Sequence, residues 1–288
     1  FDGVLTMTHH ATTLDLPGAA NITTAAGDVA TFQSTGANTV QCINYTKASG
    51  TAVISSSSVS AIGDLSDAVT TATSNIGLGS TALDSITTGD YNIALGENAL
   101  TATTEGSYNT AVGHNALTAN TTGQQNTAFG RIALLQNTTG DFNVAVGFNS
   151  LENNTTADSN TALGYSTLMA NTTGHSHVAV GKSALAANTT GAHNTALGAY
   201  TLDTCTTGTN NVAVGNYSLD ALTTASNNTS VGYAALTANT TASNNVAVGS
   251  NALVANTTGA NNTAIGKSAL VANTTSNYQV AIGNQALE

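Results

Sequence analysis

The sequence predicts an all-β chain whose main part is a parallel β-solenoid of thirteen coils, each of seventeen residues. Two observations carry this prediction. A glycine recurs every seventeen residues without insertion or deletion, and a leucine follows each glycine four residues later. The leucines begin with Leu83, Leu100 and Leu117, and the glycines are Gly79, Gly96, Gly113, Gly130, Gly147, Gly164, Gly181, Gly198, Gly215, Gly232, Gly249, Gly266 and Gly283. Such regularity is typical of stacked repeats that contact only their neighbours.

Composition excludes several classes of protein. Charged residues make up 7% of the 288 residues, and the net charge is -11. The four basic residues, Lys47, Arg131, Lys182 and Lys267, are too few to neutralise a phosphate backbone or to hold the chain on an anionic membrane. No run is apolar and long enough for membrane insertion, and no signal peptide is present. Cys42 and Cys205 are expected to be free thiols, and Phe1 suggests a fragment of a longer chain.

Residues 1–53 lack the repeat and predict a small β module. Alternating runs at 4–8, 13–16 and 40–45 are typical of half-buried strands, and turns are expected at 17–18, 27–28, 36–38 and 49–50. The segments LPG, NITTAAGD and INYTKASG resemble a module common in bacteriophage tail fibres and related tail proteins.

Residues 54–75 form a connector or collar between the module and the repeats. Ala61, Leu65, Ala68 and Val69 would line one side of a short helix in this segment. From residue 76 onward the chain is expected to form the solenoid shaft, 76–288.

Each repeat contains a three-residue strand before its glycine, such as Val144-Ala145-Val146. Its outer residues point to one side and its alanine to the other, and we expect both sides to be buried. The glycine then permits a tight corner. A threonine eight residues after the glycine and an asparagine thirteen after it are expected to bond from coil to coil.

The apolar core of each coil is thin, which favours association of chains. A buried aliphatic side chain contributes roughly 1.5–3 kcal/mol, whereas ordering each residue costs about 1.5 kcal/mol. One leucine and two strand residues cannot offset that cost for a whole coil. We therefore expect a homotrimer, with the alanine side of the strands between the chains.

The motifs GxxAL and NTAxG resemble the head repeats of trimeric adhesins of the YadA type. This resemblance implies left-handed parallel β-rolls in trimers. Longer repeats with the pattern NTAVGxxALxANTTG resemble those that precede self-cleaving chaperone domains in phage fibres. At the spacing of β-strands, thirteen coils would form a shaft of roughly 60 Å.

The acidic residues do not indicate an enzyme, and no cofactor is expected. They fall mainly at turn positions, five or eleven residues after a glycine, and no insertion creates a cleft. Asp203 and Asp220 share one position in neighbouring coils and could either bridge a Ca²⁺ ion or remain solvated turn residues. His175 and His177 could place two imidazoles on one side for a metal, or His177 could replace a structural asparagine.

Aromatic side chains recur just after the glycines. Phe148, Tyr165, Tyr200, Tyr217 and Tyr233 occupy this place and are candidate contacts for a host surface glycan, although packing at a seam between subunits would also accept them.

The preferred hypothesis is a trimeric, non-enzymatic phage tail fibre that mediates host attachment. It would lie in the extracellular virion, with other tail proteins as partners. The alternatives are a bacterial trimeric surface adhesin and an ice-binding or other extracellular β-solenoid.

Overall fold

A computed structural model describes all residues from 74 to 288 and, before residue 74, the backbone of seven short strands. The chain divides into two compact units, Phe1–Ser66 and Asp67–Glu288, which are described separately. All regular structure in the described residues is β-strand, as the sequence predicts.

The first unit is built around an antiparallel pair of long strands, β4 (Val29–Gly36) and β5 (Thr39–Thr46). Of the expected turn at 36–38, only Gly36 is described; it pairs with Thr39. Strand β5 also pairs with two shorter strands, and a separate antiparallel pair completes the unit. The shorter strands are β1 (Thr6–Met7), β2 (Leu14–Asp15), β3 (Ile22–Thr23) and β6 (Ala52–Val53). The three expected strands are present as β1, β2 and β5, and the other predicted turns lie outside the described residues.

The second unit begins with strand β7 (Ala68–Val69), where the sequence suggested the end of a helix. Strand β7 pairs antiparallel with β8, with Ala68 opposite Leu78 and Val69 opposite Gly77. The prediction of a helix is therefore wrong at Ala68 and Val69, while Ala61 and Leu65 lie outside the described residues. The first strand of the solenoid has a row of unpaired backbone groups at its edge, and pairing with β7 satisfies some of them.

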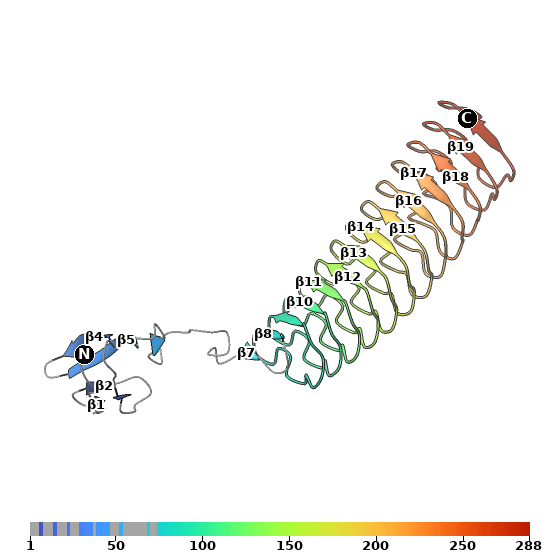
Figure 1. Cartoon of the computed structure of the whole chain (residues 1–288). Helices are drawn as coiled ribbons and strands as arrows, with labels where there is room; N and C mark the ends of the chain where they lie inside the picture. The colour runs from blue at the N-terminus through green and yellow to red at the C-terminus, as the bar shows by residue number, and fades with distance from the viewer. Residues whose placement is uncertain are drawn as a thin grey trace. The chain divides into compact units, whose positions relative to one another are not determined.

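Thirteen parallel strands follow, one in each coil, and they stack in chain order (Figure 1). Neighbouring strands align residue for residue at a shift of seventeen; for example, Val144 lies opposite Thr161. The strands are β8 (Ile76–Leu78), β9 (Ile93–Leu95), β10 (Thr110–Val112), β11 (Thr127–Phe129), β12 (Val144–Val146), β13 (Thr161–Leu163), β14 (Val178–Val180), β15 (Thr195–Leu197), β16 (Val212–Val214), β17 (Thr229–Val231), β18 (Val246–Val248), β19 (Thr263–Ile265) and β20 (Val280–Ile282). The predicted parallel β-solenoid is confirmed.

Hydrogen bonds between coils continue beyond the strands. The Leu117 N–H donates to the Ala133 carbonyl at 3.0 Å, and the Thr121 N–H donates to the Thr138 carbonyl at 2.9 Å. The Thr121 hydroxyl also donates to the Thr138 carbonyl, at 3.0 Å. The expected bonding of threonine from coil to coil is thus present, and it links the turns as well as the strands.

The corner glycines are required by both conformation and space. Their φ angles lie between 125° and 143°, which side-chain-bearing residues rarely adopt. A Cβ atom on Gly147 would lie 2.3 Å from the carbonyl oxygen of Gly164 in the next coil. This close approach and the positive φ explain why all thirteen repeats have glycine at this corner.

The strand alanines point into the coil's own interior. Ala145 has no exposed surface, whereas Val144 beside it is 37% exposed. Within one chain, therefore, only the alanine side of the strands is buried, and the prediction that the alanine side lies between chains is wrong. The interior of one coil already holds the repeated leucine, so that only a small side chain fits beside it. The larger strand residues face outward.

The repeated leucines have an unexpected backbone conformation. All thirteen have φ between 50° and 56°, the left-handed region that bulky residues seldom occupy. Those from Leu83 to Leu253 are fully buried. Burial of the side chain offsets the cost of this conformation, and the sequence contains no signal for it because leucine is not a typical residue there.

Candidate functional site: an exposed column of aromatic and basic residues

The first and third residues of the strands in the coils form what we call the outer strand face. Its members are all Val, Ile, Leu, Phe or Thr, and none is charged. Many are well exposed, with Phe129 at 57% and Leu163 at 45%. The solenoid therefore carries an uncovered, mainly apolar surface along its whole length.

A second feature crosses seven successive coils. Each coil from Gly130 to Gly232 places an aromatic or basic side chain one or two residues after its corner glycine. We call this set the aromatic-basic column: Arg131, Phe148, Tyr165, Lys182, Tyr200, Tyr217 and Tyr233. It brings together all five aromatic residues that the sequence suggested as receptor contacts. Because the coils are in register, residues seventeen apart become neighbours.

The first part of the column pairs a cation with two stacked rings. The Arg131 guanidinium lies 5.3 Å from the centroid of the Phe148 ring. The rings of Phe148 and Tyr165 are stacked, with centroids 5.5 Å apart and planes 17° from parallel. Both distances suit favourable cation–π and aromatic contacts.

The second part repeats this arrangement. The Lys182 ammonium lies 5.2 Å from the centroid of the Tyr200 ring. A hydrogen bond with Tyr200 and the charge interactions with nearby tyrosines raise the pKa of Lys182, so that it stays protonated. Tyr200 stacks on Tyr217 at 5.5 Å and 6°, and Tyr217 meets the edge of Tyr233 at 6.1 Å and 83°.

A second aromatic column was not found from the sequence. It lies twelve residues after the glycines, where Tyr91 and Tyr108 stack with ring centroids 5.0 Å apart. Both rings are more than half exposed. The spacing of seventeen between two tyrosines was the available signal. No lysine or arginine occupies this position in any coil, so the column is neutral apart from His193.

The two histidines of the HxH motif do not share one side. His175 is exposed and His177 is buried, since Ser176 between them has φ of 59° and turns the chain. His177 occupies the place of an asparagine: its Nε2 donates to the Gly191 carbonyl at 2.7 Å, and its Nδ1 accepts from the Asn194 N–H at 3.2 Å. Burial lowers its pKa to about 4. The two imidazoles cannot chelate one metal as the sequence suggested, and the structural substitution for asparagine is the arrangement found.

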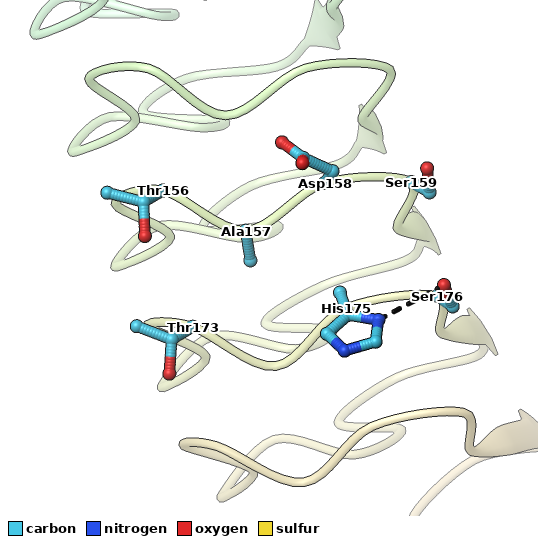
Figure 2. Close-up of a pocket in the computed structure, with 7 residues that line it drawn as sticks. All are labelled: Thr156, Ala157, Asp158, Ser159, Thr173, His175 and Ser176. Carbon is cyan, nitrogen blue, oxygen red and sulfur yellow. Dashed lines mark hydrogen bonds between the residues drawn. The ribbon is translucent and has the colours of Figure 1, made fainter.

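A shallow recess surrounds His175 (Figure 2), lined by Thr156, Ala157, Asp158, Ser159, Thr173, His175 and Ser176. Figure 2 shows the Asp158 carboxylate turned away from the imidazole. It accepts instead from the backbone N–H of Asp141, at 2.7 Å. His175 contacts Ser176 through Nδ1 at 3.3 Å and meets the ring of His193 at 4.8 Å. The recess therefore does not pair an acid with a base.

Asp203 and Asp220 lie in neighbouring coils, as expected from their spacing. Burial raises the pKa of both carboxyls, and the charge of Asp203 raises that of Asp220 further. One carboxylate oxygen of Asp220 is buried without a hydrogen-bond partner. No group of three or more His, Cys, Asp or Glu residues in the described part of the chain could hold a metal ion. Since Ca²⁺ takes six to eight oxygen ligands, this pair alone is a poor site.

Cys205 is a buried free thiol. Burial raises its pKa to about 11, which disfavours the nucleophilic thiolate. The side chain of Cys42 lies outside the described residues.

Comparison of the chain with protein-family models, with curated proteins and with solved structures gives no match. Among the described residues, no helix is long and apolar enough to span a membrane.

Proposed function

We propose that the chain is the shaft of a trimeric phage tail fibre, a structural and receptor-binding protein of the extracellular virion. The observation that carries this proposal is the outer strand face. It is uncharged over all thirteen coils and mainly aliphatic, with threonine as its one polar residue type, in a chain with a net charge of -11. Monomeric soluble proteins rarely expose a continuous apolar surface of this extent.

Association through the outer strand face would cover this surface. Three copies with these faces toward a common axis would exclude water from it and leave the turns in solvent. The resemblance of the repeats to trimeric adhesin heads, and of residues 1–53 to a tail-fibre module, favours three copies rather than two. This arrangement replaces the alanine-mediated trimer that the sequence suggested.

A structural role also fits the chemistry of the described residues. The uninterrupted repeat leaves no insertion from which a catalytic cleft could form. The exposed histidine and aspartate of the recess in Figure 2 are not paired. We therefore propose a non-enzymatic shaft that places receptor contacts, foremost the aromatic-basic column, at a distance from the rest of the virion.

Sedimentation and native mass spectrometry of the purified chain test the assembly. The wild type should be a trimer at micromolar concentration. Val144→Asp combined with Val178→Asp should dissociate it, because both residues lie on the outer strand face. Thr139→Asp combined with Thr173→Asp, which adds the same two charges at exposed turns, should leave the trimer intact. A wild type that remains monomeric would contradict the proposal.

Antibodies against residues 74–288 distinguish the two attachment hypotheses. A tail fibre should be labelled on phage particles, whereas a bacterial trimeric adhesin should be labelled on the cell surface. The ice-binding alternative has less support, because hydroxyls in the main threonine row donate to carbonyls of the next coil rather than facing solvent. Thermal hysteresis in a solution of the chain would revive it.

A further inference from the structure

The distribution of basic residues is not random along the solenoid. Three of the four in the chain, Arg131, Lys182 and Lys267, occupy the position directly after a corner glycine. All three are exposed. Within residues 74–288, none of them lies at ion-pairing distance from a carboxylate; His114 and Glu97, at 3.7 Å, form the one such contact described. On a strongly acidic chain, these cations remain available to an external anion.

The rings of the two stacked pairs in the column turn their edges, rather than their faces, away from the stack. In the pairs Phe148–Tyr165 and Tyr200–Tyr217, the rings are nearly parallel and stacked along the column, so that each ring covers a face of its partner. Stacking of a sugar on a ring face is therefore blocked within each pair. The edge of an aromatic ring carries the positive end of its quadrupole. Tyrosine hydroxyls at these edges add hydrogen-bond donors.

Outward ring edges and unpaired cations attract the same kind of ligand. We propose that the aromatic-basic column binds an extended anionic polysaccharide, whose carboxylate or phosphate groups contact Arg131 and Lys182 while its hydroxyls contact the tyrosines between and beyond them. This proposal rests on the attachment role given above and specifies the chemistry of the receptor.

The dimensions of the column suit a linear chain. Arg131 and Lys182 are three coils apart, or roughly 14 Å at the spacing of β-strands. The seven coils of the column span roughly 29 Å, enough for several sugar units lying along the shaft. Each chain of an oligomer would contribute one column, and such repeated weak sites gain strength through multivalency.

Binding of immobilised polysaccharides to the purified full chain tests the proposal. Polygalacturonate carries carboxylates, a poly(glycerol phosphate) teichoic acid carries phosphates, and dextran is neutral. The chain should bind at least one of the anionic polymers and not dextran, and the binding should weaken as salt rises. The two anionic polymers distinguish a carboxylate from a phosphate receptor. Binding to dextran with equal affinity, or to none of the three, would overturn the proposal.

Variants identify the surface responsible. Arg131→Gln combined with Lys182→Gln should lower the affinity for the anionic polymer about tenfold or more, because two contacts between opposite charges are lost. Lys267→Gln removes a cation at the same repeat position but without an aromatic neighbour in the adjacent coils, where Ser250 and Asn284 stand. It should change the affinity less than twofold.

A neutral control uses the second aromatic column. Tyr91→Ser combined with Tyr108→Ser removes a stacked pair that has no cation beside it, and it should leave binding unchanged. Equal losses in all three variants would show that charge and rings act nonspecifically, and the proposal would fail.

Sedimentation of each variant separates this proposal from the fibre hypothesis. Trimers that do not bind any anionic polymer would refute the column as a polyanion site while leaving the structural role intact. If Arg131→Gln with Lys182→Gln instead dissociates the trimer, the column belongs to the seam between subunits and the proposal is wrong.

Discussion

Two rows of buried asparagines run along the solenoid, and they differ in what they bond to. The strand asparagine row lies thirteen residues after the glycines and directly before each strand. Its side chains accept from the backbone of the next coil and donate to a backbone carbonyl fourteen residues on. At Asn143, these bonds are from the Asn160 N–H at 3.0 Å and to the Ala157 carbonyl at 2.8 Å.

The turn asparagine row lies seven residues after the glycines. Its members donate to the preceding asparagine side chain and to a carbonyl three residues on. At Asn154, these acceptors are the Asn137 side chain at 2.8 Å and the Ala157 carbonyl at 3.0 Å. Elsewhere in this row the position is filled by Ile86, Thr103, Cys205 and Leu222.

The difference shows which bonds the fold requires. The strand row satisfies backbone groups that have been removed from water, and such groups are costly to leave unpaired. The turn row donates to other side chains of the row and to backbone carbonyls that already accept a bond from the strand row, so its loss leaves fewer backbone groups unpaired. The strand row accordingly departs from asparagine only at His177 and Gln279, whose side chains can also donate and accept.

The largest expected effect breaks the strand row. Asn143→Leu would leave the buried N–H of Asn160 without its acceptor and remove one donor from the Ala157 carbonyl. We expect the unfolding free energy to fall by about 4 kcal/mol, counting the full penalty for the unpaired N–H and the lost bond to the Ala157 carbonyl, which keeps its bond from Asn154. Urea unfolding followed by circular dichroism measures this loss.

The matched variant is Asn154→Leu in the turn row. The Ala157 carbonyl keeps its bond from Asn143, and leucine already fills this position at Leu222. The expected loss is about 1 kcal/mol. Equal losses at the two positions would contradict the distinction between the rows.

Two rows of glycines, one at the corners and one in the turns, allow a similar comparison that involves no side-chain hydrogen bonds. Gly147→Ala forces alanine to a φ of 130° and toward the carbonyl of Gly164, and we expect it to cost about 3 kcal/mol. A Cβ atom on Gly140 would also lie close to a carbonyl oxygen, that of Ala157 at 2.4 Å. Because φ there is not positive and the next coil already has alanine at the same position, Gly140→Ala should cost only about 1 kcal/mol. Thermal unfolding of both variants measures the difference, and similar melting temperatures would show that contact between coils, not φ, decides.

A variant of His177 can show whether the strand asparagine row requires an amide side chain or only a hydrogen-bond acceptor. Its neutral Nδ1 accepts the Asn194 N–H, and protonation would abolish this acceptor. Because burial lowers the folded pKa from 6.5 to about 4, the unfolded chain binds a proton in this interval that the folded chain does not. Stability should therefore fall as pH drops from 6.5 to 4, by up to about 3 kcal/mol.

His177→Asn should remove this part of the pH dependence while keeping the hydrogen bonds. Urea unfolding from pH 7.5 to 4 measures the difference in unfolding free energy between this variant and the wild type. This difference separates the contribution of His177 from the titration of other groups. A difference that stays constant over this range would contradict the assignment. His175→Asn, at an exposed position, is the control.

The sequence predicts the period, the corner glycines and the bonding of threonine and asparagine between coils, because each depends on residues that recur at one position. It does not predict which side of the strands faces inward. In Val144-Ala145-Val146 one side is apolar and the other small, so that either could be a core. The width of the closed coil decides which side faces inward: Leu151 already occupies the interior, so only the small alanine side chain fits beside it.

The candidate site, too, could be predicted only in part from the sequence. The aromatic-basic column follows from register alone, and its residues could be named from their spacing. The outward direction of the ring edges depends on side-chain rotation, which no residue pattern specifies. The HxH prediction fails for a related reason: it assumes an extended backbone, whereas Ser176 is in the left-handed region.

The exact alignment of neighbouring strands has a consequence for how such a shaft changes in length. Duplication or loss of one repeat in the gene would lengthen or shorten the stack by roughly 4.8 Å, the distance between strands. Every buried residue would keep the same kind of neighbour. A unit added between the coils of Phe148 and Tyr165 would separate these two rings, whereas one added outside 130–233 would leave the whole column in contact. The length of the stack and the proposed binding column can thus be altered independently by where a repeat is inserted.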